Sequence, residues 1–231
     1  MKTASPVVII TGAGSGLGEW LGRKLLGQGC RVFGHYHRHA PDYLETAHTF
    51  QADLSDQTEA AATVANCVDQ WGRVDALINN AGVYHEKDLF SLTGQEWFEG
   101  LNTTATACFF MTRAALPHLR RSNLRRVINI GDSSAERLSK RNLAVSYHIG
   151  KTGVLLLTKS FAAAEVAHGV TVNMVSPGML ENSVGKPDVG EMPSGRFGRF
   201  DDIGNAVDFL LSSQSDHVTG TNLIVGGGWN L

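Results

Sequence analysis

The chain has 231 residues, of which 42% are hydrophobic, and a formal net charge of −2 at pH 7. A chain of this length can bury one sizeable core, so we expect a single domain over residues 1–231. The near-neutral charge gives no electrostatic basis for binding nucleic acid or an anionic membrane, and we expect neither partner. The first residues show no signal-peptide pattern and no apolar run approaches the ~20 residues of a membrane span, which together predict a cytoplasmic protein.

Short apolar runs alternate with longer segments of helical periodicity along the whole chain. The runs of strand length cover residues 7–11, 31–36, 48–52, 76–79, 126–131, 170–175 and 222–225. The segments with a helical pattern cover residues 17–28, 56–71, 93–119, 147–167 and 201–213. Runs this short and this apolar suit strands that are covered by helices on both faces. The order predicts an α/β fold, a Rossmann-type doubly wound parallel sheet of about seven strands, with ligands beyond the carboxyl ends of the strands.

The first apolar run ends in the glycine-rich turn TGAGSGLG, residues 11–18. Glycines let the chain turn tightly and let a pyrophosphate approach the backbone N–H groups at a helix N-terminus. The spacing is G-x-x-x-G-x-G rather than the G-x-G-x-x-G dinucleotide fingerprint, and such turns also serve close packing alone. The residues expected to form a cofactor turn are Gly12, Ser15, Gly16, Leu17 and Gly18.

The second apolar run ends in HYHRH, residues 35–39. An acidic residue at this strand end accepts hydrogen bonds from the ribose hydroxyls of NAD, whereas a basic residue suits the extra phosphate of NADP. His37 and Arg38 stand here instead of an acid, and a guanidinium can bind a phosphate through two hydrogen bonds. The alternating histidines have no acidic or cysteine ligand beside them, so we expect no metal site, and a purely structural basic strand end stays an alternative. The pattern favours NADP(H) as the cofactor.

Further motifs follow the later apolar runs. In chain order they are Asp53-Leu54, NNAG at residues 79–82, Asn102 in GLNTTA, Tyr147-x-x-x-Lys151 and Pro177-Gly178. Each alone has an ordinary explanation as a turn or as a surface pair on a helix. Together with the glycine turn, in this order and over essentially the whole chain, they resemble the short-chain dehydrogenase/reductase family.

The resemblance implies a dinucleotide site that spans most of the chain. Asp53 and Leu54 correspond to the family's adenine-contacting pair, and Asn182 stands where many members have a Thr that meets the nicotinamide amide. The cofactor-binding residues so implied are Gly12, Ser15, Gly16, Leu17, Gly18, His37, Arg38, Asp53, Leu54, Asn80, Ala81, Gly82, Tyr147, Lys151, Pro177, Gly178 and Asn182.

The Y-x-x-x-K pair provides the expected chemistry. Hydride transfer to a carbonyl or imine leaves negative charge on the heteroatom, so the site needs a proton donor close to it. Free tyrosine has a pKa of about 10, and we expect the Lys151 ammonium, one helical turn after Tyr147, to lower that pKa. The resemblance further implies that Lys151 contacts the nicotinamide ribose and that Asn102 helps to hold a proton-relay water.

The family's catalytic serine has no unambiguous counterpart in this chain. The family's usual strand ending resembles INISS, whereas this chain has INIGDSS. Counting from the strand end places Asp132 at the serine position, and counting back from Tyr147 places Ser134 there, with Ser133 between them. Ser134 is the first candidate and Asp132 the second.

Asp132 also suggests a substrate. Pteridine reductases, a branch of the same family, carry Asp in place of the Ser, a strand end similar to HYHR, and an aromatic residue after NNA that stacks on the pterin. Tyr84 occupies that last place here, although an aromatic residue at a pocket mouth can equally be a general contact surface. The glycine turn departs from that branch, because it has Ser15 and Gly16 where pteridine reductases carry a basic residue.

We therefore expect an NADP(H)-dependent oxidoreductase that transfers a hydride to a carbonyl or pterin-type C=N group of a small-molecule substrate. A pteridine reductase-like activity is the first expectation, and reduction of a 3-oxoacyl thioester or small carbonyl is the alternative. A dinucleotide-binding sensor or a scaffold is the non-catalytic alternative.

Two expectations concern the surface. Residues 180–200 are rich in Gly and Pro and are predicted to form a mobile substrate loop. The family usually forms dimers and tetramers through helices that correspond to residues 93–119 and 147–167. We therefore expect a homo-oligomer, a homotetramer or a dimer.

Overall fold

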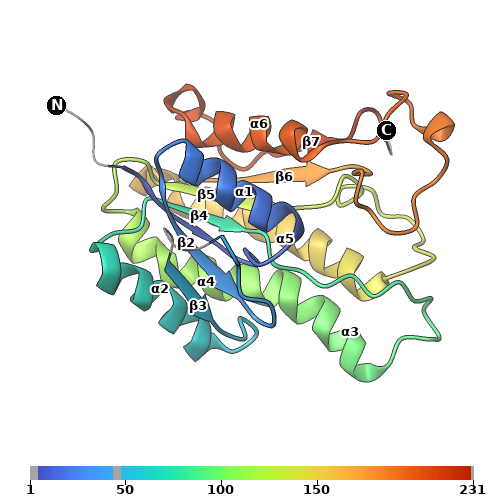
Figure 1. Ribbon diagram of the computed structural model, residues 1–231, viewed down its shortest axis with the longest axis horizontal. Coiled ribbons are helices and arrows are strands. Elements are labelled where there is room, and N and C mark those ends of the chain that lie inside the picture. Colours follow the sequence, from blue (N-terminus) through green and yellow to red (C-terminus); the bar gives the residue numbers. More distant parts are fainter. Residues whose placement is uncertain (1–4, 44–47, 230–231) are drawn as a thin grey trace.

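The computed structural model describes residues 5–43 and 48–229, and in these ranges strands and helices alternate as predicted (Figure 1). The strands are β1 (Val7–Ile10), β2 (Arg31–Tyr36), β3 (His48–Gln51), β4 (Ala76–Asn79), β5 (Arg126–Ile130), β6 (Thr171–Pro177) and β7 (Asn222–Val225). The α-helices are α1 (Gly16–Gly27), α2 (Gln57–Trp71), α3 (Gly94–Leu101), α4 (Ala107–Leu119), α5 (Val145–Glu165) and α6 (Phe200–Leu211). Short 3-10 turns lie at Val166–His168, Val189–Glu191 and Ser213–Ser215.

The strands form one sheet in the order β3-β2-β1-β4-β5-β6-β7, and every neighbouring pair is parallel. This confirms the predicted doubly wound α/β fold. The chain runs outward from β1 to β3 and then returns to place β4 on the other side of β1. Ligands of open α/β sheets bind at such a reversal, which here lies beyond the carboxyl ends of β1 and β4.

Side-chain alternation along the strands divides the core into two layers. Val7 and Ile9 of β1 pack with α2 and α4, while Val8 and Ile10 pack with α1 and α6. Figure 1 shows the same division, with α1 and α6 above the sheet and α2 and α4 below it. Because both faces are covered, the strands contain almost continuous apolar residues, which explains why their positions could be predicted.

The predicted helix over residues 93–119 is not continuous. A π-helical segment, Asn102–Thr106, separates α3 from α4. The threonine hydroxyls in this segment bond to backbone carbonyls of the preceding turn: Thr104 Oγ1 donates to Gly100 O at 2.7 Å and Thr103 Oγ1 donates to Glu99 O at 2.8 Å. Such hydroxyl bonds compete with regular helix geometry, and short π segments are frequent at functional sites.

The segment 180–200 folds back on itself rather than extending from the sheet. Leu180 and Gly198 form an isolated bridge, and a 3-10 turn lies at Val189–Glu191 between them. The mobility predicted for this loop stays a prediction. In the described ranges, none of the helices combines the length and the apolar character that a membrane crossing requires.

Candidate active site

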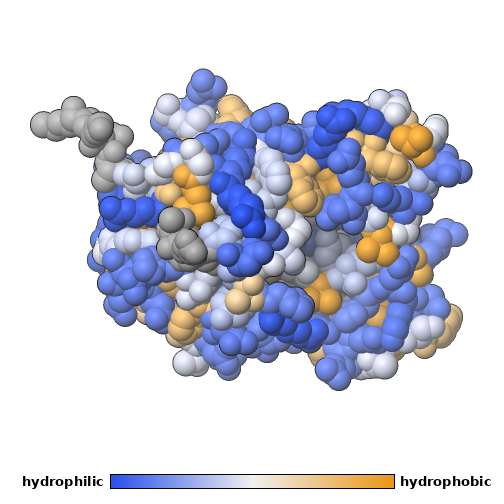
Figure 2. Space-filling view, viewed as in Figure 1, coloured by the Kyte–Doolittle hydropathy of each residue, from blue (hydrophilic) through white to orange (hydrophobic). Residues whose placement is uncertain are grey.

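Two adjoining cavities open at the carboxyl ends of the strands. The larger cleft has a volume of about 590 Å³ and the smaller cavity about 260 Å³. Both are lined by Gly12, Ser15, Ala81 and Gly82, so the two cavities meet at the reversal between β1 and β4. The surface is hollowed on this side of the molecule, to the right of centre in Figure 2.

The glycine turn forms the floor where the two cavities meet. Gly12 has a φ of +66°, a conformation that an L side chain rarely adopts, and its N–H donates to His35 Nδ1 at 3.2 Å. Helix α1 begins at Gly16, and the side chain of its N-cap, Ser15, makes no capping hydrogen bond. The N-terminus of α1 therefore offers backbone donors and a favourable dipole to an anion, which fits a pyrophosphate.

The other predicted residues of this turn divide into two groups. Leu17 lines the larger cleft, whereas Gly16 and Gly18 lie outside the walls of both cavities. A Cβ atom on Gly18 would lie 2.1 Å from Gly12 O, so this glycine lets the first turn of α1 pack against the loop. Its position serves the shape of the turn rather than a ligand contact.

The NNAG segment is joined to the glycine turn by hydrogen bonds. Thr11 Oγ1 accepts from the N–H groups of Asn80 and Ala81, each at 2.9 Å. The Asn80 side chain donates back to Thr11 O at 3.0 Å and to Gly12 O at 3.2 Å. Asn80 therefore holds the two loops together, while Ala81 and Gly82 present backbone to both cavities.

The smaller cavity lies between the ends of β2 and β3 and the helix α3. Its walls include the predicted residues His37, Arg38, Asp53 and Leu54, together with His39. Arg38 is largely exposed, with 64% of its side chain accessible, and its Nη2 atom donates to Glu99 Oε1 at 2.8 Å. The guanidinium and the neighbouring rings supply the donors that a phosphate on an adenosine ribose requires.

His35 has a structural position. It is buried, its Nε2 lies 2.9 Å from Ala52 O, and its Nδ1 accepts from Gly12 N–H. Burial lowers the pKa of His35 to about 4, so the ring is neutral near pH 7. Within residues 5–43 and 48–229, no three His, Cys, Asp or Glu side chains are grouped so that they could hold a metal ion.

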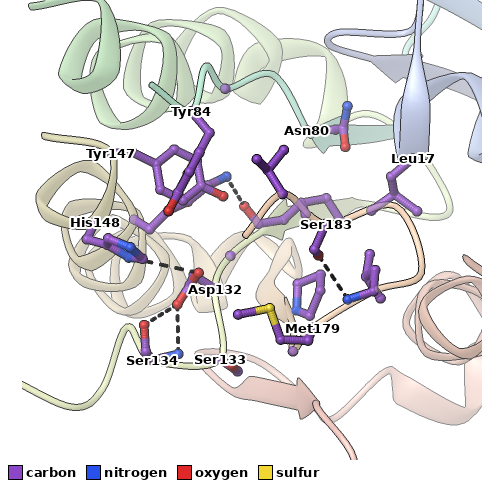
Figure 3. Close-up of a pocket in the computed structure, with 18 of the residues that line it drawn as sticks. Leu17, Asn80, Tyr84, Asp132, Ser133, Ser134, Tyr147, His148, Met179 and Ser183 are labelled. Atoms are coloured by element: carbon purple, nitrogen blue, oxygen red, sulfur yellow. Dashed lines mark hydrogen bonds and ion pairs between the residues drawn. The ribbon is translucent and has the colours of Figure 1, made fainter. Parts of the chain in front are cut away.

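Tyr147 and Lys151, in the first turns of α5, both line the larger cleft, and Figure 3 shows Tyr147 there. Lys151 is buried, and its Nζ donates to Ile130 O at 2.7 Å, which fixes the ammonium at the carboxyl end of β5. The same Nζ lies 5.4 Å from the centroid of the Tyr147 ring. The Asn102 side chain points elsewhere: its Oδ1 accepts from Thr106 Oγ1, and Asn102 lines neither cavity.

The prediction that Lys151 lowers the pKa of Tyr147 is wrong for this structure. Burial raises the pKa of Tyr147, and the Asp132 carboxylate and Tyr84 raise it further. Burial also lowers the pKa of Lys151 to about 8, against the opposing effect of Asp132. Desolvation is larger than the attraction between the two groups because both side chains lie in a poorly hydrated pocket. The phenol is thus strongly protonated and able to donate.

The structure brings all three candidates for the serine position to the same wall. Asp132, Ser133 and Ser134 line the larger cleft just beyond β5. Asp132 Oδ1 accepts from the Ser134 backbone N–H at 2.8 Å and also from the Ser134 hydroxyl. Asp132 and Ser134 are therefore hydrogen-bonded neighbours on one wall of the cleft, and either side chain can contact a substrate there.

The remaining side of the cleft near Tyr147 is aromatic. The Tyr84 ring, 40% exposed, contacts Tyr147 edge-on with centroids 5.2 Å apart, and it lies 6.1 Å from the ring of His148. His148 Nδ1 is 4.0 Å from Asp132 Oδ2, and burial lowers the pKa of His148. Figure 3 shows Tyr84, Tyr147, His148 and Asp132 grouped on one side of the cleft.

The opposite wall follows β6. Pro177, Gly178 and Asn182, all predicted, line the larger cleft there. Lining residues outside the predicted set include Gly131, Arg141, His148, Met179 and Trp229, while Leu180, Ser183 and Val184 belong to the predicted substrate loop 180–200. His148 was identifiable as the neighbour of Tyr147, whereas the others come from loops whose paths no local motif specifies.

Comparisons with known proteins agree with this geometry. The family model described as enoyl-(acyl carrier protein) reductase matches residues 12–230. The chain is 30% identical over 242 residues to a 3-oxoacyl-(acyl-carrier-protein) reductase of Vibrio cholerae, covering 99% of this chain and 98% of the relative. It is 32% identical over 243 residues to a 2-dehydro-3-deoxy-D-gluconate 5-dehydrogenase of Bacillus subtilis, covering 96% and 93%.

Solved structures are similar over the same length. A blue fluorescent protein from a metagenomic library, in complex with NADPH, superposes with a TM-score of 0.87 at 28% identity, covering 98% of each chain. A ligand-free aldohexose dehydrogenase of Thermoplasma acidophilum superposes with a TM-score of 0.86 at 25% identity, covering 97% of this chain and 93% of the other.

Proposed function

The chain belongs to the short-chain dehydrogenase/reductase family, and from this premise we propose that it is an NADP(H)-dependent reductase of a carbonyl or pterin-type C=N group. The observation that carries the proposal is the larger cleft, where Tyr147 and Lys151 lie beside a glycine turn shared with a second cavity that contains Arg38. A sensor or scaffold would need neither the buried lysine nor the proton donor.

The two cavities fit a dinucleotide. The N-terminus of α1 suits the pyrophosphate, the smaller cavity suits the adenosine half, and the cleft along β5 and β6 suits the nicotinamide. His37 and Arg38 support NADP(H) rather than NAD(H), because they place cationic or neutral donors where an acid would repel a phosphate. A structural neighbour at 28% identity was solved with NADPH. When bound, the nicotinamide supplies the hydride.

We assign the proton transfer to Tyr147. Its raised pKa keeps the phenol protonated until the substrate oxygen or nitrogen gains negative charge. Lys151, fixed by Ile130 O, places a positive charge near the ring and stabilises the phenolate that forms. Asn102 is assigned a positioning role, because its side-chain oxygen accepts from the Thr106 hydroxyl within the π segment that leads into α4 and the residue does not line the cleft.

The substrate that the local geometry favours is a pterin or a similar amino-substituted ring. The Asp132 carboxylate lies in the cleft wall with 23% of its side chain exposed, and it can accept from a ligand N–H in addition to the Ser134 hydroxyl. Tyr84 supplies an exposed aromatic ring next to Tyr147 for a flat substrate. A 3-oxoacyl thioester or small carbonyl is the second candidate, favoured by the 3-oxoacyl reductase of Vibrio cholerae.

The first experiment follows NADPH absorbance with dihydropterins, acetoacetyl-coenzyme A and simple ketones, using the wild type, Asp132→Asn and Ser134→Ala. For a pterin reductase we expect pterin turnover that falls about tenfold to a hundredfold in Asp132→Asn, the range for a lost charged hydrogen bond. Turnover of thioesters or ketones alone, with the larger loss in Ser134→Ala, would assign the second function. No NADPH oxidation with any of these substrates would contradict a reductase and favour a sensor.

We also propose that the chain forms a homo-oligomer, a dimer or a tetramer. Phe98 of α3 and Ile149 and Leu156 of α5 are exposed by 62%, 48% and 67%. Apolar side chains of this size on neighbouring helices suit a self-complementary interface. Light scattering is expected to give a mass of two or four chains, and a monomer mass would contradict this proposal.

The loop 180–200 is proposed as a substrate loop. Leu180, Asn182, Ser183 and Val184 contribute to the wall of the larger cleft, and Figure 3 shows Ser183 across the cleft from Tyr84. Hydrogen exchange with and without NADPH and substrate is expected to show protection that increases in this segment on binding.

A further inference from the structure

Glu99 joins the smaller cavity to the loop that follows β4. Its Oε1 accepts from Arg38 Nη2 at 2.8 Å, and its Oε2 lies 2.9 Å from His85 Nε2. Only 18% of the Glu99 side chain is exposed, compared with 64% for Arg38. The carboxylate is therefore the fixed member of the ion pair and the guanidinium is the member that can move.

The ion pair crosses the smaller cavity. Arg38 belongs to the loop after β2 and Glu99 to the last turn of α3, and both residues line this cavity, on different elements. Arg38 is the residue expected to bind the phosphate of the adenosine ribose. In this structure, one of its terminal nitrogens is already bonded to a carboxylate.

Glu99 is held in place from behind. His85 lies between the two glutamates of α3, with Nδ1 4.0 Å from Glu96 Oε1. Lys87 Nζ donates to that same Glu96 oxygen at 2.6 Å. The Glu99 carboxylate cannot swing away from the cavity without losing its contact with His85, so it stays beside any ligand that Arg38 binds.

We propose that Glu99 is a cofactor-selecting residue that competes with the ribose phosphate of NADP(H) for Arg38 and thereby limits the preference for NADP(H) over NAD(H). This inference rests on the proposed function, because it assumes that the smaller cavity holds the adenosine half of a dinucleotide. The acidic residue that favours NAD(H) is then Glu99 on α3. The loop after β2, where such an acid is expected, has only basic and ring side chains at residues 37–39.

The sign of the effect follows from charge. A phosphate dianion bound by Arg38 must share the guanidinium with the carboxylate and also lies close to its negative charge. NAD(H) has ribose hydroxyls instead, which can donate to Glu99 without repulsion. Removing the charge of Glu99 therefore strengthens binding of NADPH and leaves NADH unchanged or weaker.

The test is the dissociation constants of NADPH and NADH, measured by calorimetry for the wild type and for Glu99→Gln. We expect the ratio of the NADH to the NADPH dissociation constant to rise about threefold to tenfold in Glu99→Gln, as for one charge removed near a dianion in a hydrated site. Asp69→Asn is the control: it removes one negative charge at an exposed residue of α2 that lines neither cavity. Its ratio should equal that of the wild type.

The outcomes are distinguishable. If the wild type binds neither dinucleotide, the proposed function fails and this inference fails with it. If the wild type binds both and the ratio in Glu99→Gln is unchanged or falls, only the inference is overturned. A rise of equal size in Asp69→Asn would also overturn it, because the effect would then belong to net charge.

A double-variant cycle tests the competition itself. In an Arg38→Ala background there is no guanidinium to share, so Glu99→Gln should change the ratio less than it does with Arg38 present. An undiminished change would show that the carboxylate acts on the ligand alone and would refute competition for Arg38. Because the readout is binding, an inactive enzyme or an unidentified substrate does not affect it.

Discussion

The smaller cavity and the larger cleft share the glycine turn, but the cation in each has a different exposure to solvent. In the smaller cavity the cation is Arg38, largely exposed and paired with Glu99 across the opening. In the larger cleft the cation is Lys151, which is buried and bonded to Ile130 O. Exposed charges interact through a high dielectric and select among ligands by modest amounts, whereas buried charges shift pKa values and change reaction rates.

This difference predicts that the largest effect of any single change lies in the larger cleft. Tyr147→Phe removes the hydroxyl and keeps the ring, so turnover should fall by about 10²-fold to 10⁴-fold, the usual contribution of a general acid. NADPH binding, measured by calorimetry, should remain. Tyr84→Phe is the matched control, because it removes a hydroxyl from the neighbouring ring of the same cleft. An equal loss in Tyr84→Phe would contradict the assignment of the proton to Tyr147.

The smaller cavity should respond in binding rather than in turnover. Arg38→Ala removes the guanidinium, and NADPH binding should weaken about tenfold to a hundredfold, the range for hydrogen bonds to a charged group. NADH should bind as in the wild type, because its ribose has no phosphate. Arg31→Ala, at the exposed amino end of the same strand β2, is the control and should change neither constant. Equal weakening of NADPH and NADH in Arg38→Ala would refute a phosphate-specific role.

The buried charge in the larger cleft also has a consequence for stability. Burial lowers the pKa of Lys151 from an ordinary 10.5 to about 8, so the unfolded chain binds this proton more tightly than the folded chain does. At pH 7 the difference disfavours folding by about 3 kcal/mol, and it disappears as pH rises from 8 to 10.5.

Lys151→Met should therefore be more stable than the wild type at pH 7, by about 1–3 kcal/mol after the loss of the bond to Ile130 O. The gain should shrink when urea unfolding is repeated at pH 10, because the folded lysine is then neutral and the unfolded lysine has begun to lose the proton that it binds more tightly. A variant that is less stable than the wild type at pH 7 would show that the hydrogen bond outweighs the desolvation. Glycine-turn and surface substitutions offer no comparable pH dependence.

The two regions also differ in how much of them could be predicted from sequence. Residues around the smaller cavity follow strands directly, as Asp53 and Leu54 do after β3, so a local motif identifies them. The fold could be predicted for the same reason, because buried parallel strands leave unbroken apolar runs. What no motif shows is a pair such as Arg38 and Glu99, which are 61 residues apart and meet only through the packing of α3.

The larger cleft was harder to predict because its chemistry depends on burial. Tyr147 and Lys151 could be identified by spacing, but the direction of the Tyr147 pKa shift could not, since it depends on burial and on the charges of Asp132 and Tyr84, which only the fold brings close. Spacing could not decide between Asp132 and Ser134 for the serine position, and the structure places both on the same wall, joined by a hydrogen bond. The π segment depends on hydroxyl bonds from Thr103 and Thr104 that helical periodicity does not encode.

The smallest expected effect is on the pH profile, and it compares the two regions in one experiment. In the direction of reduction Tyr147 must be protonated, and its raised pKa keeps it so across the accessible range. Lys151 must carry its charge to stabilise the phenolate, and it loses that charge as pH rises through about 8. The turnover number should therefore be constant from pH 6.5 to pH 7.5 and fall up to tenfold per pH unit above about 8.

NADPH binding, measured over the same pH range, shows whether the group that titrates lies in the larger cleft or in the smaller cavity. Arg38 stays charged throughout because guanidinium deprotonates only above pH of about 12, so its contribution to binding should not change. A turnover number that falls while NADPH binding stays constant assigns the titration to Lys151. A turnover number that is constant up to pH 9.5 would mean that Lys151 keeps its proton in the working enzyme. The negative charges of the bound dinucleotide would then raise the Lys151 pKa by more than burial lowers it.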